Sequence, residues 1–196
     1  MKRNQKLRHR QRLRVIGGKW GGRQIHFPES PQIRPTAART RETLFNWLQH
    51  DIQDARCLDL FAGSGALGIE ALSRGARFCD FVDTDSTALN SIKRALANLA
   101  ANDFAATHKE TAKNFVMEGQ IWDVIFLDPP FGTLLGFEAL TALYEYQCLH
   151  PQSLIYLEAR ADENIETTDT KYVTYREKVA GQVRYQLFKP PEALGE

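Results

Sequence analysis

The sequence predicts an α/β fold built on a mostly parallel sheet. Short apolar strands alternate with segments whose apolar residues recur at helical spacing, as at positions 89, 92, 96 and 99. Such alternation is typical of a doubly wound sheet, which binds its ligands at the carboxyl ends of the strands. The 196 residues, 43% of them apolar, are enough for one domain whose core needs neither disulfides nor a metal.

The expected elements follow the chain in order. A hairpin comes first, around the glycine turn after Lys19 and Trp20, and Thr36 suits the N-cap of a helix that runs to Leu48. The expected strands are 57–60, 78–82, 104–107, 124–127 and 154–157, and the expected helices are 66–74, 86–99 and 137–146. Segments 172–178 and 182–188 are expected to close the fold as an antiparallel hairpin.

The net charge of +1 conceals a strong asymmetry. Residues 1–41 carry twelve Lys or Arg against Glu29 alone, a net +11, whereas residues 42–196 carry thirteen basic and twenty-three acidic residues, a net −10. A basic block of this kind is typical of an arm that binds a polyanion, because each neutralised phosphate releases counterions. An idle solvated tail is the alternative. A secretory signal or a membrane span is not expected, because no apolar run has the necessary length.

Cys57, Cys79 and Cys148 are scattered, and no C-x-x-C motif or His-rich segment accompanies them. We expect buried, reduced thiols, which are usual in a cytoplasmic protein, and no metal site.

A glycine-rich turn follows the first predicted strand of the sheet. Gly63 to Gly68 satisfies G-x-G-x-x-G between a strand and a helix, a pattern that permits either a dinucleotide or S-adenosylmethionine. Asp83, at the end of the next strand, can accept hydrogen bonds from the ribose hydroxyls of either ligand. Asp59 favours S-adenosylmethionine, because a carboxylate here would repel a pyrophosphate and attract a cationic amino-acid group. The alternative role of Asp59 is to cap the loop, and Asp85 is expected to cap the following helix.

The motif Asp128-Pro129-Pro130-Phe131 follows a predicted buried strand. Proline fixes the backbone and removes an N–H donor, which leaves a rigid run of hydrogen-bond acceptors. A conjugated amino group on a nucleobase is a poor nucleophile, and Asp128 with the Pro129 carbonyl can accept its two N–H bonds. Phe131 can stack on the base, worth ~1–3 kcal/mol. Asp-Pro-Pro alone is also an ordinary turn, but both motifs at successive strand ends predict an amino-methyltransferase.

The chain resembles the RsmD family, the bacterial 16S rRNA guanine-N2 methyltransferases. The resemblance covers nearly the whole length, through the segments that begin at Arg14 (Arg-Val-Ile-Gly-Gly-Lys-Trp), Arg34 (Arg-Pro-Thr), Arg41 (Arg-Glu-Thr-Leu-Phe-Asn-Trp-Leu), Asp59, Asp128 and Arg176 (Arg-Glu-Lys-Val-Ala-Gly-Gln-Val). It implies a Rossmann-like methyltransferase fold and methylation of guanine 966 in the assembled 30S subunit. The expected division is then a basic arm and hairpin at 1–35, in contact with RNA, and a catalytic domain at 36–196.

The resemblance also implies roles for individual residues. Asp59, Gly63 and Gly65 would hold the methionine part of S-adenosylmethionine and Asp83 its ribose, while Asp128 and Phe131 would meet the guanine. Asp83 stands where the family usually has Glu. Thr111-Ala112 stands where Asp or Asn usually precedes Ala, so backbone or water is expected to contact the adenine. The residues expected to contact RNA are Arg10, Arg12, Arg14, Lys19, Arg34, Arg39 and Pro130.

Three other functions compete with this one. A DNA adenine-N6 or protein glutamine-N5 methyltransferase would share the Pro-Pro motif, though more often with Asn and Tyr around it. An NAD-dependent oxidoreductase has no use for Asp-Pro-Pro-Phe, and a non-catalytic RNA-binding assembly factor would explain only the basic arm. We expect a monomeric, cytoplasmic enzyme.

Overall fold

The computed structural model describes residues 10–28, 36–117, 119–163 and 171–191. Across these ranges a seven-stranded sheet has the order β5-β4-β3-β6-β7-β9-β8. Its strands are β3 (Arg56–Asp59), β4 (Phe78–Asp83), β5 (Ala105–Lys109), β6 (Val124–Leu127), β7 (Leu154–Arg160), β8 (Val173–Ala180) and β9 (Val183–Lys189). Neighbours from β5 to β7 are parallel, and β9 is antiparallel to both β7 and β8. The predicted mostly parallel sheet with an antiparallel carboxyl-terminal hairpin is confirmed.

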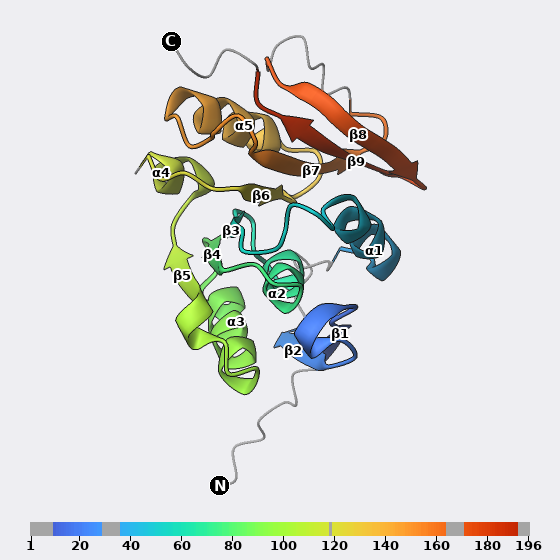
Figure 1. Cartoon of the computed structure of the whole chain (residues 1–196), viewed down its shortest axis with the longest axis vertical. Helices are drawn as coiled ribbons and strands as arrows, with labels where there is room; N and C mark the ends of the chain where they lie inside the picture. The colour runs from blue at the N-terminus through green and yellow to red at the C-terminus, as the bar shows by residue number, and fades with distance from the viewer. Residues whose placement is uncertain (1–9, 29–35, 118, 164–170, 192–196) are drawn as a thin grey trace, which may run out of the picture.

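Helices cover both faces of this sheet (Figure 1). They are α1 (Ala38–Trp47), α2 (Ala66–Ser73), α3 (Ser86–Asn98), α4 (Ala112–Val116) and α5 (Leu135–Glu145), with short 3-10 turns at Gly18–Trp20 and Asn102–Phe104. Successive strand residues point to opposite faces. Cys57 and Val124 accordingly join the core shared with α1, α2 and α3, whereas Leu58 and Ile125 join the core beneath α5. The fold is therefore doubly wound.

Two features of the helices differ from the sequence prediction. Thr36 does not cap α1, because the N-cap residue is Ala37 and no side chain caps the helix. Helix α4 was not predicted, since its five residues are too few to show a helical period. The boundaries of the other predicted helices and of the seven strands of the main sheet lie within three residues of those observed, whereas the first hairpin strand, expected at 13–18, is Arg10–Arg14.

The amino-terminal hairpin consists of β1 (Arg10–Arg14) and β2 (Gln24–Pro28), which pair antiparallel as predicted. Its apolar side chains join the same core as α1, α2 and α3, and they are Leu13, Val15, Trp20, Ile25 and Phe27. Arg12 and Arg14 alternate with these buried residues and are exposed. The hairpin therefore presents a basic outer face from a rigid base.

Buried Glu70 of α2 anchors this hairpin. Its two carboxylate oxygens accept 2.8 Å hydrogen bonds from the backbone N–H groups of Ile16 and Gly17. Arg74 pairs with the same carboxylate at 2.8 Å, and buried Arg41 of α1 lies 3.6 Å from it. One carboxylate thus joins the hairpin to two helices. In the described ranges no helix is long and apolar enough to cross a membrane.

Candidate active site

Three carboxylates come together at the carboxyl edge of the parallel strands. Asp59 ends β3, where it pairs with Phe81 of β4 and Phe126 of β6. Two residues after these partners lie Asp83, the last residue of β4, and Asp128, directly after the end of β6. The charges of Asp128 and Asp83 both raise the pKa of Asp59, as expected for acids in one site.

The glycine-rich turn lies between β3 and α2. Gly63 and Gly65 have φ angles of +50° and +75°, a region that favours glycine, and Gly65 is the N-cap of α2. At Gly68, a Cβ atom would lie 2.3 Å from the ring of Phe81, so glycine alone allows this close approach of helix and strand. These glycines let the turn and the first residues of α2 pack closely against the ends of the strands.

Asp59 is buried with 2% of its surface exposed, and it accepts a 2.9 Å hydrogen bond from the Gly68 N–H. The loop-capping contact is therefore present in the structure. Burial raises the pKa of Asp59 to about 8, because a charged carboxylate loses hydration there. Such an acid favours a cationic ligand, which would restore its charge.

Asp83 is half-buried beside the same turn. One carboxylate oxygen accepts the Gly63 N–H and the other accepts the Asp85 N–H, each at 2.8 Å. These bonds fix the carboxylate, and each oxygen keeps a further lone pair. Asp85 in turn accepts the Thr87 N–H at 2.7 Å, so its predicted role as the N-cap of α3 is confirmed.

Thr111 and Ala112 lie after β5, next to Asp83. The Glu110 N–H donates to the Asp83 carbonyl at 3.3 Å, which brings this segment to the end of β4. Thr111 is the N-cap of α4 and its hydroxyl accepts the Asn114 N–H at 3.3 Å. The Thr111 side chain therefore caps α4. Ala112 is partly buried and packs against the core beneath α5.

The Asp-Pro-Pro-Phe loop leaves the end of β6. Half-buried Asp128 accepts a 2.7 Å hydrogen bond from the Thr36 hydroxyl, and burial raises the pKa of Asp128 above its ordinary value while this bond lowers it. Pro129 is buried, whereas Pro130 is exposed and Phe131 keeps 42% of its surface exposed. The loop thus presents an anchored carboxylate next to an available aromatic ring.

Two residues that interact with Asp128, Glu158 and Thr36, are not predicted from the sequence to lie in the site. Leu127 pairs with Leu157, so Glu158 reaches the level of Asp128 on the neighbouring strand. Burial, and then the charge of Asp128, raises the pKa of Glu158, and the Tyr156 hydroxyl donates to it at 2.6 Å. The only signal in the sequence was an acid near the end of a predicted strand. The sequence predicts Thr36 as a helix cap, whereas its hydroxyl binds Asp128.

The predicted RNA-contact residues do not form a single cluster. Arg12 and Arg14 share the exposed face of β1, Lys19 lies exposed at the turn, and Arg39 is exposed on α1. Pro130 belongs to the loop described above, and only the backbone of Arg10 is described. Arg34 lies outside the described residues.

Cys57, Cys79 and Cys148 are free and buried, as predicted. Across the described residues, no group of three or more His, Cys, Asp or Glu side chains could hold a metal ion.

Comparison with known proteins places the chain in a family. The family model of conserved hypothetical protein 95 matches residues 13–189. The chain is 41% identical over 184 residues to the ribosomal RNA small subunit methyltransferase D of Escherichia coli, covering 94% of this chain and 92% of that protein. The protein of the same name from Haemophilus influenzae is 39% identical over 181 residues, with coverage of 90% and 93%.

Solved structures agree with this assignment. The Escherichia coli protein yhhF has a TM-score of 0.83 at 40% identity, covering 92% of this chain and 99% of that one. The Thermus thermophilus 16S rRNA N2 G1207 methyltransferase, solved with S-adenosylmethionine and guanosine, shares the fold with a TM-score of 0.73 at 18% identity, covering 93% of this chain and 50% of that one. The chain therefore belongs to the family of conserved hypothetical protein 95 and the ribosomal RNA small subunit methyltransferase D proteins, the RsmD family that its sequence resembles.

Proposed function

We propose that this protein transfers a methyl group from S-adenosylmethionine to the exocyclic N2 of a guanine in 16S rRNA. The guanine is the one that the family resemblance implies, position 966, within the assembled small subunit. The observation that carries the proposal is the Asp-Pro-Pro-Phe loop, which stands at a strand end beside a glycine-rich turn. Relatives at about two-fifths identity that bear the name of small-subunit rRNA methyltransferases support it.

Asp59, Gly63, Gly65 and Asp83 would hold the cofactor, with Thr111 and Ala112 at its adenine. The buried Asp59, with a pKa of about 8, fits a cationic amino group, and the fixed carboxylate of Asp83 fits a pair of hydroxyls. When bound, S-adenosylmethionine supplies an activated methyl group. The chain's own residues would bind it and exclude water.

Asp128 would position the guanine amino group by accepting a hydrogen bond from one of its two N–H groups. The Thr36 hydroxyl occupies Oδ2, so Oδ1 remains for the amino group. The carbonyl of Pro129 would accept the second N–H, and the exposed ring of Phe131 would stack on the base. An amino nitrogen held this way would become pyramidal, with its lone pair available to accept a methyl group, so positioning and electrostatics would provide the catalysis.

RNA would be held by Arg10, Arg12, Arg14, Lys19, Arg34 and Arg39, with Pro130 beside the target base. The exposed arginines of β1 are well placed for phosphates, which set affinity and register rather than sequence preference. A monomer in the cytoplasm, where ribosomes are assembled, fits this role.

The test is methyl transfer from labelled S-adenosylmethionine to small subunits from a strain that lacks the enzyme, followed by mass spectrometry of the nucleosides. We expect N2-methylguanosine at one position of 16S rRNA. Parallel assays with DNA and with protein as the acceptor test the alternative methyltransferases, which methylated adenine or methylated glutamine would support instead. RNA binding without any transfer would support the assembly-factor alternative.

A further inference from the structure

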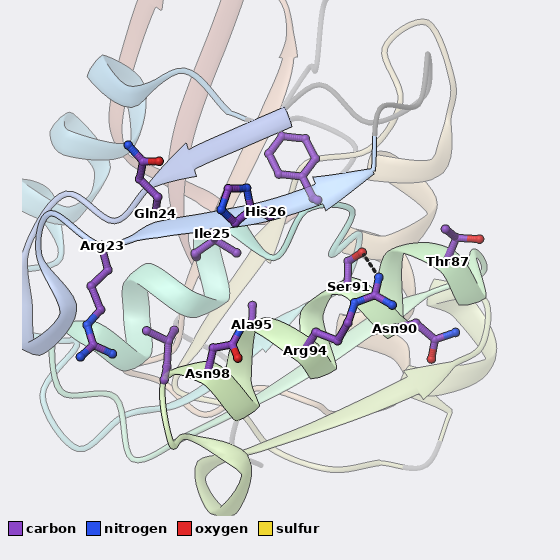
Figure 2. A pocket seen from close by; sticks show the side chains of 12 residues that line it. Arg23, Gln24, Ile25, His26, Thr87, Asn90, Ser91, Arg94, Ala95 and Asn98 are labelled. Carbon is purple, nitrogen blue, oxygen red and sulfur yellow. Dashed lines mark hydrogen bonds between the residues drawn. The ribbon is translucent and has the colours of Figure 1, made fainter. Parts of the chain in front are cut away.

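A groove lies between β2 and α3, outside the candidate active site (Figure 2). Its volume is about 550 Å³. Buried Ile25 and Phe27 of the hairpin and Ala95 of the helix form its apolar floor. The groove follows α3 from Thr87 to Asn98, about 16 Å at a helical rise of ~1.5 Å per residue.

The rim of this groove is basic and polar. Arg23 and His26 border it from the hairpin, and Asn90, Arg94 and Asn98 border it from α3, all of them exposed. Figure 2 shows Arg23 and Asn98 at one end and Thr87 at the other. Of the twelve residues that line the groove, none is Asp or Glu. A rim with this chemistry attracts an anion and gives it amide hydrogen-bond partners.

One wall of the groove, helix α3, begins at the candidate active site. Thr87, in the first turn of α3, lies two residues after Asp85, whose N–H donates to Asp83 of the site. A ligand in the groove would thus lie next to a ligand at the strand ends.

The groove also continues the basic face of the hairpin. In the antiparallel register, Arg12 lies opposite His26 and Arg14 opposite Gln24, so these side chains share the exposed face. A chain of phosphates could pass from that face onto Arg23 and Arg94 without meeting a carboxylate of the lining.

We propose that this groove binds single-stranded RNA next to the target nucleotide. Arg23 and Arg94 contact its phosphates, and the amides of Asn90 and Asn98 hydrogen-bond to its sugars or base edges. This inference rests on the proposed function, because it concerns the same RNA. The groove positions the strand rather than reading its sequence, since phosphate contacts carry no sequence information of their own.

The test is methyl transfer to unmethylated small subunits by the full chain with both Arg23→Gln and Arg94→Gln. The double change should disturb the fold little, because the one hydrogen bond described for the Arg94 side chain joins it to Ser91, three residues away. We expect KM for the subunit to rise at least tenfold while kcat at saturation and the affinity for S-adenosylmethionine stay unchanged. The slope of log KM against log salt should become shallower by about 1.4, at ~0.7 for each single-strand phosphate that an arginine no longer neutralises.

The matched control removes two charges outside the groove, through Lys93→Gln on α3 and Lys178→Gln on β8, neither of which lines it. It should keep the wild-type KM and salt slope. Asn90→Asp places a carboxylate on the rim with almost no change of shape, and it should also raise KM. Equal KM values for the arginine variant and the control would overturn the groove proposal. If the wild-type chain itself methylates no RNA, the proposed function fails instead.

Discussion

The Thr36 hydroxyl donates a 2.7 Å hydrogen bond to Oδ2 of Asp128, a residue 92 positions later in the chain. The bond ties the segment before α1 to the end of β6, where the methyl acceptor would bind. It also counters burial, which raises the pKa of Asp128, by stabilising the charged carboxylate. Only that charged form has both oxygens free of a proton to accept an N–H bond.

Thr36→Val should therefore weaken catalysis most strongly at low pH. Without the hydroxyl the pKa of Asp128 rises further, so a smaller fraction of the carboxylate is charged at a given pH. We expect kcat to fall about tenfold at mildly acidic pH, from ~1.5 kcal/mol for a hydrogen bond to a charged group, and to recover as the pH rises. The measurement is the pH profile of kcat. Thr43→Val on α1, which removes only a hydrogen bond to the Arg39 carbonyl, is the control. The same pH profile of kcat in both variants would contradict this role of Thr36.

Asp128→Ala should separate turnover from cofactor binding. If the carboxylate acts on the amino group in the transition state, turnover should fall by about two orders of magnitude or more, with the affinity for S-adenosylmethionine nearly unchanged. Single-turnover transfer and calorimetry measure the two quantities. Asp103→Ala, at an exposed position after α3, serves as the control. A variant that keeps more than about a third of wild-type turnover would remove Asp128 from the mechanism.

Asp59 should release a proton when the cofactor binds. Its pKa of about 8 means that it is mostly protonated at pH 7, and a cationic amino group beside it would lower that pKa. We expect a release of close to one proton at pH 7, vanishing as the pH rises well above 8. Calorimetry in two buffers of different ionisation enthalpy measures the release. Asp59→Asn should abolish it, and an unchanged release in that variant would assign the proton to another group.

Glu70→Ala should destabilise the fold through the hairpin. The change leaves the N–H groups of Ile16 and Gly17 without their acceptor and leaves buried Arg41 without a counter-charge. Breaking a buried pair in this way costs about 3–5 kcal/mol of unfolding free energy. Urea denaturation measures it, with Glu145→Ala at the exposed end of α5 as the control. If the free energy of unfolding falls by less than ~1 kcal/mol, the contacts of Glu70 add little to the stability of the fold.

The order of strands and helices could be predicted because each element has a local sequence pattern that indicates it. The period of Leu89, Ile92 and Leu96 and the glycine turn after Asp59 each span only a few residues. Strand ends of a parallel sheet meet at one edge, so the closeness of Asp59, Asp83 and Asp128 followed from the order of elements alone.

The rest of the site depends on contacts between distant segments. Thr36 reads locally as a helix cap, yet its partner is Asp128, and Glu70 reads as a helical surface acid although it is fully buried. Glu158 reaches Asp128 only through the register of β6 with β7. The groove likewise exists only because the hairpin packs on α3, which no pattern in either segment specifies.

The last prediction concerns the state of the RNA substrate. A base that enters the Asp128 loop must leave its stack, which costs a few kcal/mol unless it is already unpaired. The described ranges form one sheet with its helices and one hairpin, and the basic surface at β1, β2 and α3 suits docking rather than opening a helix. The family resemblance implies a target loop that is displayed in the assembled 30S particle. We therefore expect efficient methylation of unmodified 30S particles and weak activity on protein-free 16S rRNA. Tritium transfer from labelled S-adenosylmethionine to the two substrates, prepared from the same deletion strain, compares them directly. Labelling of the naked RNA at an equal or higher rate would show that the enzyme recognises local RNA alone.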